Sequence, residues 1–281
     1  MNHKSFSTAL LRRGWVFLVM VGLLQACGGG HKSAAPAPVP VITDPTGYYS
    51  NNGTLPALGI TDLQGMVTST RFIMASKLQG YYYDGPITVT GNTITGNLVQ
   101  FITPGADNDS AILNATINPD HSITGTVTHS INHVANAFTL NYATGRANST
   151  VAAIVNTPNP GNVSWQGTLY NVNATNGTDT LTINLADNAA GAAALTTVTP
   201  MVSNAEFRDC AFTGTLTPIS GTSMYQVSFN ATAVGPSCGG IGGPYTGLAT
   251  LRTQNILNDT LVIAAYYYDT TTYAALFGEF Q

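Results

Sequence analysis

Residues 225–229 read Tyr-Gln-Val-Ser-Phe and carry the pattern on which the fold of this chain depends. Successive side chains of a β-strand point to opposite faces. Tyr225, Val227 and Phe229 would therefore share one face, and the two polar residues would share the other. Such alternation is typical of a strand that buries one face against a core. The segment predicts an antiparallel strand with one buried side.

Short apolar segments of the same kind recur through the chain. Gly, Pro, Asp or Asn-Gly interrupts them about every 8 to 15 residues, as in antiparallel sandwiches and barrels. Only 8% of residues are charged, while 44% are hydrophobic. This composition predicts an all-β protein, whose one candidate helical turn is the Ala-rich stretch 186–195, interrupted by Gly191. The segments that support the prediction are 87–89, 94–99, 111–117, 181–185, 248–251 and 261–265.

The sequence Thr-Pro-Asn-Pro-Gly at 157–161 marks a boundary, because neither a helix nor a central strand would hold it. It predicts two small antiparallel β-barrel or β-sandwich domains, β-domain 1 at 47–157 and β-domain 2 at 162–281. The two parts share an element, Thr-Gly-Thr within 122–128 and again within 211–217. Each copy reads as a strand, a loop and a return strand. One larger interleaved barrel is the alternative.

The N-terminus carries an export signal. Basic residues precede an apolar run, Trp15 to Leu24, of about ten residues, whereas a helix needs roughly 20 to cross a bilayer. The run ends in Leu-Gln-Ala-Cys27, which resembles a bacterial lipobox. The resemblance implies a lipoprotein signal peptide at 1–26 and acylation of Cys27, and Gly28 in place of aspartate implies the outer membrane. An ordinary signal peptide with an accidental cysteine is the alternative.

Residues 27–46 are rich in Gly, Ala and Pro and predict a flexible tether. Once Cys27 is assigned to lipid, Cys210 and Cys238 remain as a pair in an exported chain. A disulfide between them would stabilise the fold by roughly 3–4 kcal/mol in the chain-entropy model. Two free thiols or a metal-binding pair are the alternatives, but the CxxC spacing of metal sites is absent.

The second half resembles a group of largely uncharacterised proteobacterial lipoproteins with tandem antiparallel β-domains. The segments that carry the resemblance are 210–218, 224–229, 245–249 and 274–278, together with Cys238. The first half is similar more weakly, through 47–49 and 71–74. The resemblance implies small antiparallel barrels or sandwiches and assigns no catalytic residues.

Most motifs that carry chemistry are absent from the sequence. There is no Ser-x-x-Lys, His-Glu-x-x-His or phosphate-binding Gly-x-x-x-x-Gly-Lys. The Gly-x-Ser-x-Gly pattern occurs once, at 235–239, but it includes Cys238 and is not expected on the strand-to-helix turn that such a nucleophile needs. His121, His129 and His133 lie close together, but their surroundings favour a strand and loops over a metal-binding helix. The residues 107–109, Asp-Asn-Asp, read as a solvated turn and lack the further ligands of a calcium loop. We expect no enzyme activity, no metal and no cofactor.

Two Tyr-Tyr-Tyr-Asp sequences, at 81–84 and 266–269, place aromatic rings on both faces of any strand that contains them. One face can fill a core, but the other must meet a second layer, a ligand or solvent. The candidate contact aromatics are Tyr81, Tyr82, Tyr83, Tyr266, Tyr267 and Tyr268. Packing at a barrel edge, with the hydroxyls in water, is the alternative.

These observations predict an exported, lipid-anchored protein of the outer membrane that faces either the periplasm or the outside. The net charge of −4 excludes the basic surface that nucleic acids require. We expect a non-enzymatic interaction or structural role, with the membrane and a protein or envelope component as partners. The alternative is a lipocalin-like module that holds an apolar or sugar-like ligand in its barrel. An envelope hydrolase would need His121 or His129 to meet an aspartate and a nucleophile.

Overall fold

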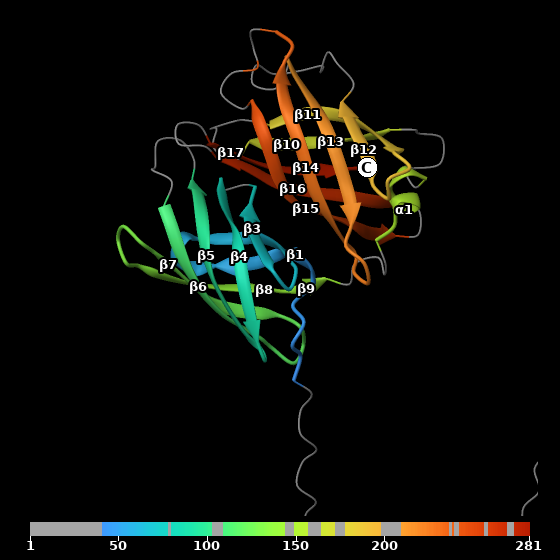
Figure 1. The fold of residues 1–281 in the computed structure, drawn as a ribbon. Coiled ribbons are helices and arrows are strands. Elements are labelled where there is room, and N and C mark those ends of the chain that lie inside the picture. Colours follow the sequence, from blue (N-terminus) through green and yellow to red (C-terminus); the bar gives the residue numbers. More distant parts are fainter. Residues whose placement is uncertain are drawn as a thin grey trace, which may run out of the picture. The chain divides into compact units, whose positions relative to one another are not determined.

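The computed structural model describes residues 41–77, 80–102, 109–143, 149–156, 164–171, 178–197, 209–235, 238, 242–255, 258–268 and 273–281. The predicted signal peptide, Cys27, most of the tether, the boundary loop at 157–161 and the Asp-Asn pair at 107–108 lie outside these residues. The described strands form two closed antiparallel barrels, which confirms the predicted all-β fold class (Figure 1).

The first barrel is a meander in which each strand pairs with the next one along the chain. Strand β1 closes it by pairing with both β2 and β8, and the short β9 pairs with the N-terminal part of β1. A single 3-10 turn, η1 (Pro56–Leu58), joins β1 to β2. The strands are β1 (Gly47–Leu55), β2 (Ile60–Val67), β3 (Arg71–Ser76), β4 (Tyr81–Thr90), β5 (Thr93–Ile102), β6 (Asp109–Ile117), β7 (Ile123–His129), β8 (Ala135–Leu140) and β9 (Tyr142–Ala143).

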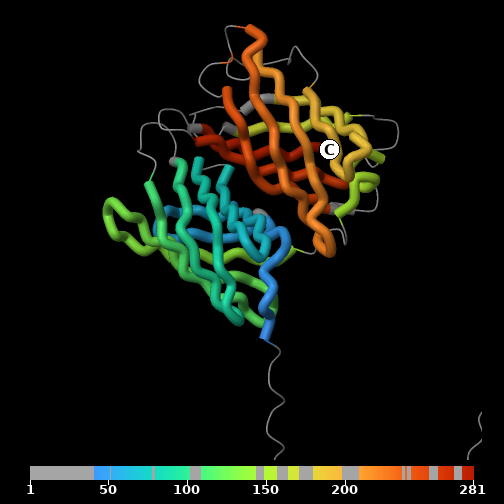
Figure 2. Tube along the Cα trace, viewed as in Figure 1, coloured from blue at the N-terminus to red at the C-terminus, as the bar shows by residue number. Residues whose placement is uncertain are grey.

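The second barrel is an eight-stranded meander closed by pairing between its first and last strands, β10 and β17. Figure 2 lets the reader follow the chain from the blue and green strands of the first barrel to the yellow, orange and red strands of the second. The strands are β10 (Trp165–Asn171), β11 (Thr178–Asp187), β12 (Ala193–Thr197), β13 (Cys210–Pro218), β14 (Met224–Ala233), β15 (Gly243–Asn255), β16 (Asn258–Tyr268) and β17 (Tyr273–Phe280).

The described α-helix, α1 (Val151–Val155), precedes the predicted boundary but packs on the second barrel. Thr150 caps its first turn by accepting a hydrogen bond from the backbone N–H of Ala153. Ile154 is fully buried in the second core, and its carbonyl accepts a hydrogen bond of 2.9 Å from the Trp165 indole. The chain therefore enters the second barrel before the Pro-Asn-Pro sequence.

The prediction of a helical turn at 186–195 is wrong. Strand β11 continues to Asp187, and β12 begins at Ala193 after a tight turn. The side chains of Asp187 and Asn188 accept hydrogen bonds from backbone N–H groups two residues on, which stabilises a turn rather than a helix. Gly191 has a φ of +77° in that turn, a conformation that suits glycine.

The shared Thr-Gly-Thr element lies on β7 in the first barrel and on β13 in the second. A Cβ atom on Gly125 would lie 2.4 Å from the Asn114 carbonyl oxygen, and one on Gly214 would lie 2.1 Å from that of Ser228. Both glycines therefore permit a close approach between neighbouring strands. Because β7 is the seventh strand of its barrel and β13 the fourth of its own, the element marks a shared local geometry rather than equivalent strands.

Three clusters of buried residues hold this part of the chain together. One fills the first barrel and includes Leu63, Phe72 and Leu113. Another fills the second barrel with side chains that include Trp165 and Phe212. The third joins the outer faces of the two barrels, so several strands are buried on both sides. A strand of that kind reads as a continuous apolar run.

Candidate functional site

The two barrels meet along a shared apolar surface that we call the seam. It combines side chains from β1 to β5 of the first barrel with side chains from β14 to β17 of the second. Its buried members are Tyr48, Met66, Ile73, Ala75, Tyr82, Phe101, Met224, Leu248, Val262, Ala264, Ala275 and Phe277. The seam is therefore a hydrophobic core in its own right, and it explains why so few charged residues remain for the surface of these strands.

Within the described residues, all three Lys and Arg side chains lie at the seam. Arg71 forms a two-pronged ion pair with Asp84, at 2.8 and 2.9 Å, and also donates to the backbone carbonyl of Thr246 in the second barrel. The Arg71 guanidinium lies 5.5 Å from the ring centre of Tyr266. One cation thus connects a carboxylate of the first barrel with the backbone and an aromatic ring of the second.

Asp84 is fully buried and also accepts a hydrogen bond of 3.0 Å from the Tyr82 hydroxyl. Burial raises the pKa of the Asp84 carboxyl, and Arg71 and Tyr82 act in the opposite direction. The same burial raises the pKa of Tyr82 well above its ordinary value. The ion pair therefore offsets the free-energy cost of burying the Asp84 carboxylate. Removing either partner would leave an uncompensated charge that destabilises the fold.

A second charged group lies further along the seam. The Lys77 ammonium donates to one carboxylate oxygen of Glu279 at 2.6 Å. The other oxygen of Glu279 lies 4.0 Å from the Arg252 guanidinium, which also donates to the Tyr48 hydroxyl at 3.5 Å. Lys77 and Tyr48 belong to the first barrel, so these contacts also cross the seam.

Beside this group, the outer wall of the second barrel is hollowed by a depression of about 260 Å³ that we call the seam pocket. Three buried polar atoms of its lining have no hydrogen-bond partner: Arg252 Nε, Thr260 Oγ1 and Glu279 Oε1. Its lining residues are Gln166, Gly167, Thr168, Tyr170, Arg252, Thr260, Glu279 and Gln281. Buried polar groups in native proteins usually have a partner, so these atoms require an explanation.

The predicted contact tyrosines have several different environments. Tyr82 and Tyr83 are fully buried, which corrects their assignment as contact residues. Tyr82 faces the seam, where the second barrel supplies the second layer that its strand requires. Tyr83 points into the first barrel, and its hydroxyl bonds to His129 at 3.2 Å. Tyr81 is partly buried and packs on the same core.

The second tyrosine triplet shows the same alternation along β16. Tyr266 is partly buried against the seam, and its ring lies 5.5 Å from that of Phe101. Tyr267 packs on the second core beside Tyr245. Tyr268 is 53% exposed, so it alone of the six presents more than half of its surface to a partner.

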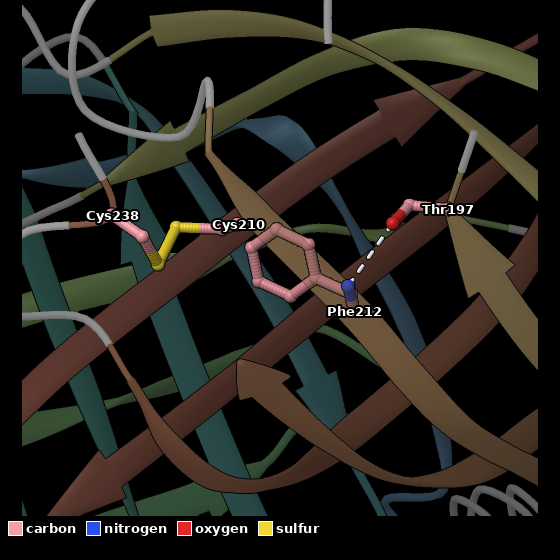
Figure 3. The surroundings of a disulfide bond; sticks show 4 residues. All are labelled: Thr197, Cys210, Phe212 and Cys238. Atoms are coloured by element: carbon pink, nitrogen blue, oxygen red, sulfur yellow. Dashed lines mark hydrogen bonds between the residues drawn. A yellow bond between two sulfur atoms is a disulfide. The ribbon is translucent and has the colours of Figure 1, made fainter. Parts of the chain in front are cut away.

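The predicted disulfide between Cys210 and Cys238 is present (Figure 3). It ties the first residue of β13 to the connection between β14 and β15. Cys210 is fully buried, and two residues on, the backbone N–H of Phe212 donates to Thr197 Oγ1 at 3.0 Å. The bond therefore anchors the end of the second barrel where that strand begins.

The three histidines do not form a metal site. His121 and His133 lie at turn positions with φ of 64° and 54°, whereas His129 ends β7 and is buried. No group of three or more potential metal-ligating His, Cys, Asp or Glu side chains occurs within the residues described. Burial lowers the pKa of His129, while nearby Asp109 acts to raise it.

The surroundings of His129 also do not align a nucleophile with a base. His129 Nε2 contacts the Tyr83 hydroxyl and the Asn136 amide nitrogen, both of which can donate to it. The Ser130 hydroxyl donates instead to Asp109, whose other oxygen accepts from a backbone N–H. In a catalytic triad the serine would bond to the imidazole. This polar cluster is therefore arranged as a closed hydrogen-bond network at the end of β7.

The described apolar side chains inside the second barrel are closely packed. Eight apolar side chains leave a cavity of only about 20 Å³ among them, with no polar lining. Sites for drug-sized ligands occupy about 300–1,000 Å³. The lipocalin-like alternative is therefore not supported for this barrel, because Leu, Ile and Phe side chains occupy the space that a ligand would need.

We expect native mass spectrometry of the full-length protein, released from detergent micelles, to show no apolar adduct of a few hundred daltons. The cavity of about 20 Å³ described in the second core is too small for one. The measured mass should include one disulfide. A reproducible apolar adduct that survives release would contradict the filled-core interpretation.

A depression of about 380 Å³ on the outer surface lies over β4, β5 and β6. It belongs to an uncharged surface that we call the threonine face. Cross-strand pairing aligns its residues in rows, for example Thr88, Thr95, Asn114 and Thr126 on four successive strands. The other members are Thr90, Thr93, Asn97, Ile112, Thr116 and Thr124.

Within the described residues, no helix is long and apolar enough to span a membrane. Sequence reasoning also missed the Arg71–Asp84 pair and the seam pocket. The available signal was the scarcity of charge, because a cation and a carboxylate 13 residues apart stand out in such a chain.

No protein-family model matches the chain, and no curated protein matches it. A solved structure named "putative outer membrane protein" from Bacteroides fragilis NCTC 9343 aligns over 83% of this chain and 96% of its own, with 11% identity and a TM-score of 0.27. A DUF3598-family protein of unknown function from Nostoc punctiforme PCC 73102 aligns over 84% and 95%, with 9% identity and a TM-score of 0.28. At these scores neither similarity bears on function, and the fold rests on the strand pairing described above.

Proposed function

We propose that this chain is a non-enzymatic cell-envelope lipoprotein, anchored in the outer membrane through Cys27, that binds its partners with the outer surfaces of two joined barrels. The filled interior of the second barrel carries the binding part of this proposal, since it leaves about 20 Å³ for a ligand. The lipobox-like sequence that ends at Cys27 supports the anchor, and Gly28 supports the outer-membrane destination.

The non-enzymatic part is supported by the hydrogen bonding around His129. Its Nε2 atom is occupied by Tyr83 and Asn136, and Ser130 is held by Asp109. A serine hydrolase needs the opposite arrangement, with the imidazole bonded to the hydroxyl that attacks the substrate. The polar residues at this end of the first barrel thus serve its structure.

The threonine face is the surface that best suits an external partner. It is uncharged, and its exposed hydroxyl and amide groups can each donate and accept hydrogen bonds. Ile112, which is 52% exposed, lies beside these groups and lines the depression of about 380 Å³. Such a surface is complementary to an uncharged, hydrogen-bonding component of the envelope.

Replacing Cys27 with alanine is expected to abolish palmitate labelling of the chain and to remove it from the outer-membrane fraction, because no acyl chains can then be attached. Gly28→Asp is the matched variant. It should keep the palmitate label but shift the protein to the inner-membrane fraction. Metabolic labelling followed by density-gradient separation of the two membranes measures both effects.

Two results would count against the proposal. Palmitate labelling that persists in the Cys27→Ala variant would place the anchor elsewhere. An unlabelled wild-type protein found free in the periplasm would support the alternative of an ordinary signal peptide.

A further inference from the structure

The seam pocket contains more unsatisfied polar chemistry than the packing of the barrels requires. Thr260 is 1% exposed, and its hydroxyl has no hydrogen-bond partner. Arg252 lies directly opposite Thr260 in the β15–β16 pairing, and its Nε–H is also unpartnered. A buried polar group without a partner destabilises the fold, so two adjacent unpartnered groups on residues that line one depression indicate a missing acceptor.

The third unpartnered atom has the opposite requirement. Glu279 Oε1 is a carboxylate oxygen that needs a donor, since Lys77 occupies only the other oxygen. The guanidinium of Arg252 is 4.0 Å from Oε1, beyond hydrogen-bond distance. A ligand in the pocket would therefore need a hydrogen-bond acceptor beside Arg252 and Thr260 and a hydrogen-bond donor beside Glu279.

The charges around the pocket define the occupant further. Lys77 and Arg252 are positive and Glu279 is negative, so the group carries one excess positive charge. An anionic ligand would balance it. A carboxylate matches the planar edge of a guanidinium and can accept from a neighbouring hydroxyl at the same time.

We propose that the seam pocket binds a small hydroxylated monocarboxylate of the size of a sugar acid. Its carboxylate accepts hydrogen bonds from Arg252 Nε and Thr260 Oγ1, and one of its hydroxyl groups donates to Glu279 Oε1. The volume of about 260 Å³ lies just below the range of drug-sized sites, which suits a ligand of this size. This inference goes beyond the proposed function and does not depend on the lipid anchor or on the threonine face.

The test uses the full-length protein and D-glucuronate as the probe, with isothermal titration calorimetry as the readout. D-Glucose is the neutral match, and D-glucosamine is the cationic one. We expect saturable binding of glucuronate with one site per chain. Glucose should bind about 10- to 100-fold more weakly because it lacks the charge-assisted hydrogen bonds, and glucosamine should not bind.

Two variants locate the site. Thr260→Val removes the unpartnered hydroxyl and should weaken glucuronate binding about 10-fold while leaving thermal stability unchanged or slightly higher. Arg252→Lys keeps the charge but removes the Nε donor and should weaken binding by a similar factor. Both expectations follow from the role of these atoms as ligand donors.

Thr250→Val is the matched control. Thr250 lies two residues from Arg252 on the same strand face and is also fully buried, but its hydroxyl donates to the Ser223 carbonyl at 3.1 Å. This variant should lower stability and leave glucuronate binding unchanged. The pair thus separates loss of a ligand contact from general damage to the barrel.

The proposal is overturned if the wild-type protein binds none of the three sugars, a result that would assign the pocket to water. It is also overturned if glucose and glucuronate bind equally, or if Thr260→Val and Arg252→Lys leave the affinity for glucuronate unchanged.

Discussion

Replacing Arg71 with methionine is expected to lower the free energy of unfolding by about 3–5 kcal/mol at pH 8. The substitution leaves the Asp84 carboxylate fully buried with only the Tyr82 hydroxyl as a side-chain partner. It also removes the hydrogen bond from Arg71 to the Thr246 carbonyl across the seam. Urea unfolding followed by circular dichroism measures the loss.

The same variant should be less damaged at low pH. Burial already raises the pKa of Asp84 with Arg71 present, and without the guanidinium the pKa must rise further. A carboxyl whose pKa is higher in the folded state than in the unfolded state binds a proton more readily when folded. Stability therefore falls as the pH rises from about 4 through the raised pKa of Asp84, by up to about 1.4 kcal/mol per pH unit.

The double variant Arg71→Met, Asp84→Leu is the control. It removes both charges, so no uncompensated carboxylate remains, and most of the lost stability should return. Its stability should also lose the pH dependence of the single variant. Equal losses in the single and double variants would show that the ion pair matters only through its packing.

The second large effect concerns the disulfide. Replacing both Cys210 and Cys238 with alanine is expected to lower the free energy of unfolding by roughly 3–4 kcal/mol. The sequence alone predicts that reduction would affect the second half and leave the first half little changed. The seam alters that expectation, because twelve buried side chains from both barrels form one core.

We therefore expect both barrels of the double cysteine variant to lose protection together. Hydrogen exchange measured by mass spectrometry follows each barrel separately, and Trp165 fluorescence reports on the second core. The wild-type protein unfolded with and without a reductant is the control. Loss of protection in β10–β17 alone would contradict the coupling and restore two independent domains.

Alternation along the chain predicted the strands well. The segment 225–229 lies in β14 with Tyr225, Val227 and Phe229 buried, and 111–117 lies in β6 with strict alternation of burial. The disulfide could also be predicted, because the predicted export and lipidation leave two cysteines to pair. The strands depend on residues that are neighbours in the sequence, and the disulfide depends on the number of cysteines.

The seam could not be predicted in the same way. Alternation of apolar and polar residues indicates which side chains share a face of a strand, but it does not indicate what packs against that face. A second barrel is one of several structures that could pack there. The run Leu261–Ala265 is buried throughout and carried the available signal, a strand with two apolar faces. The pairing of Arg71 with Asp84 depends on the register between β3 and β4. In that register, the residue opposite Arg71 lies two positions from Asp84, and the residue opposite Asp84 lies two positions from Arg71.

The strands at the seam are buried on both faces, which limits how the two barrels could be separated or exchanged. A first barrel on its own would present Tyr48, Met66, Ile73, Tyr82 and Phe101 to solvent, a surface prone to self-association. During the predicted export, the first barrel would expose this surface until the last strands of the chain had crossed the membrane. Recombination that replaced one barrel would have to supply an outer surface that matches the other barrel. We therefore expect the two barrels to be inherited together.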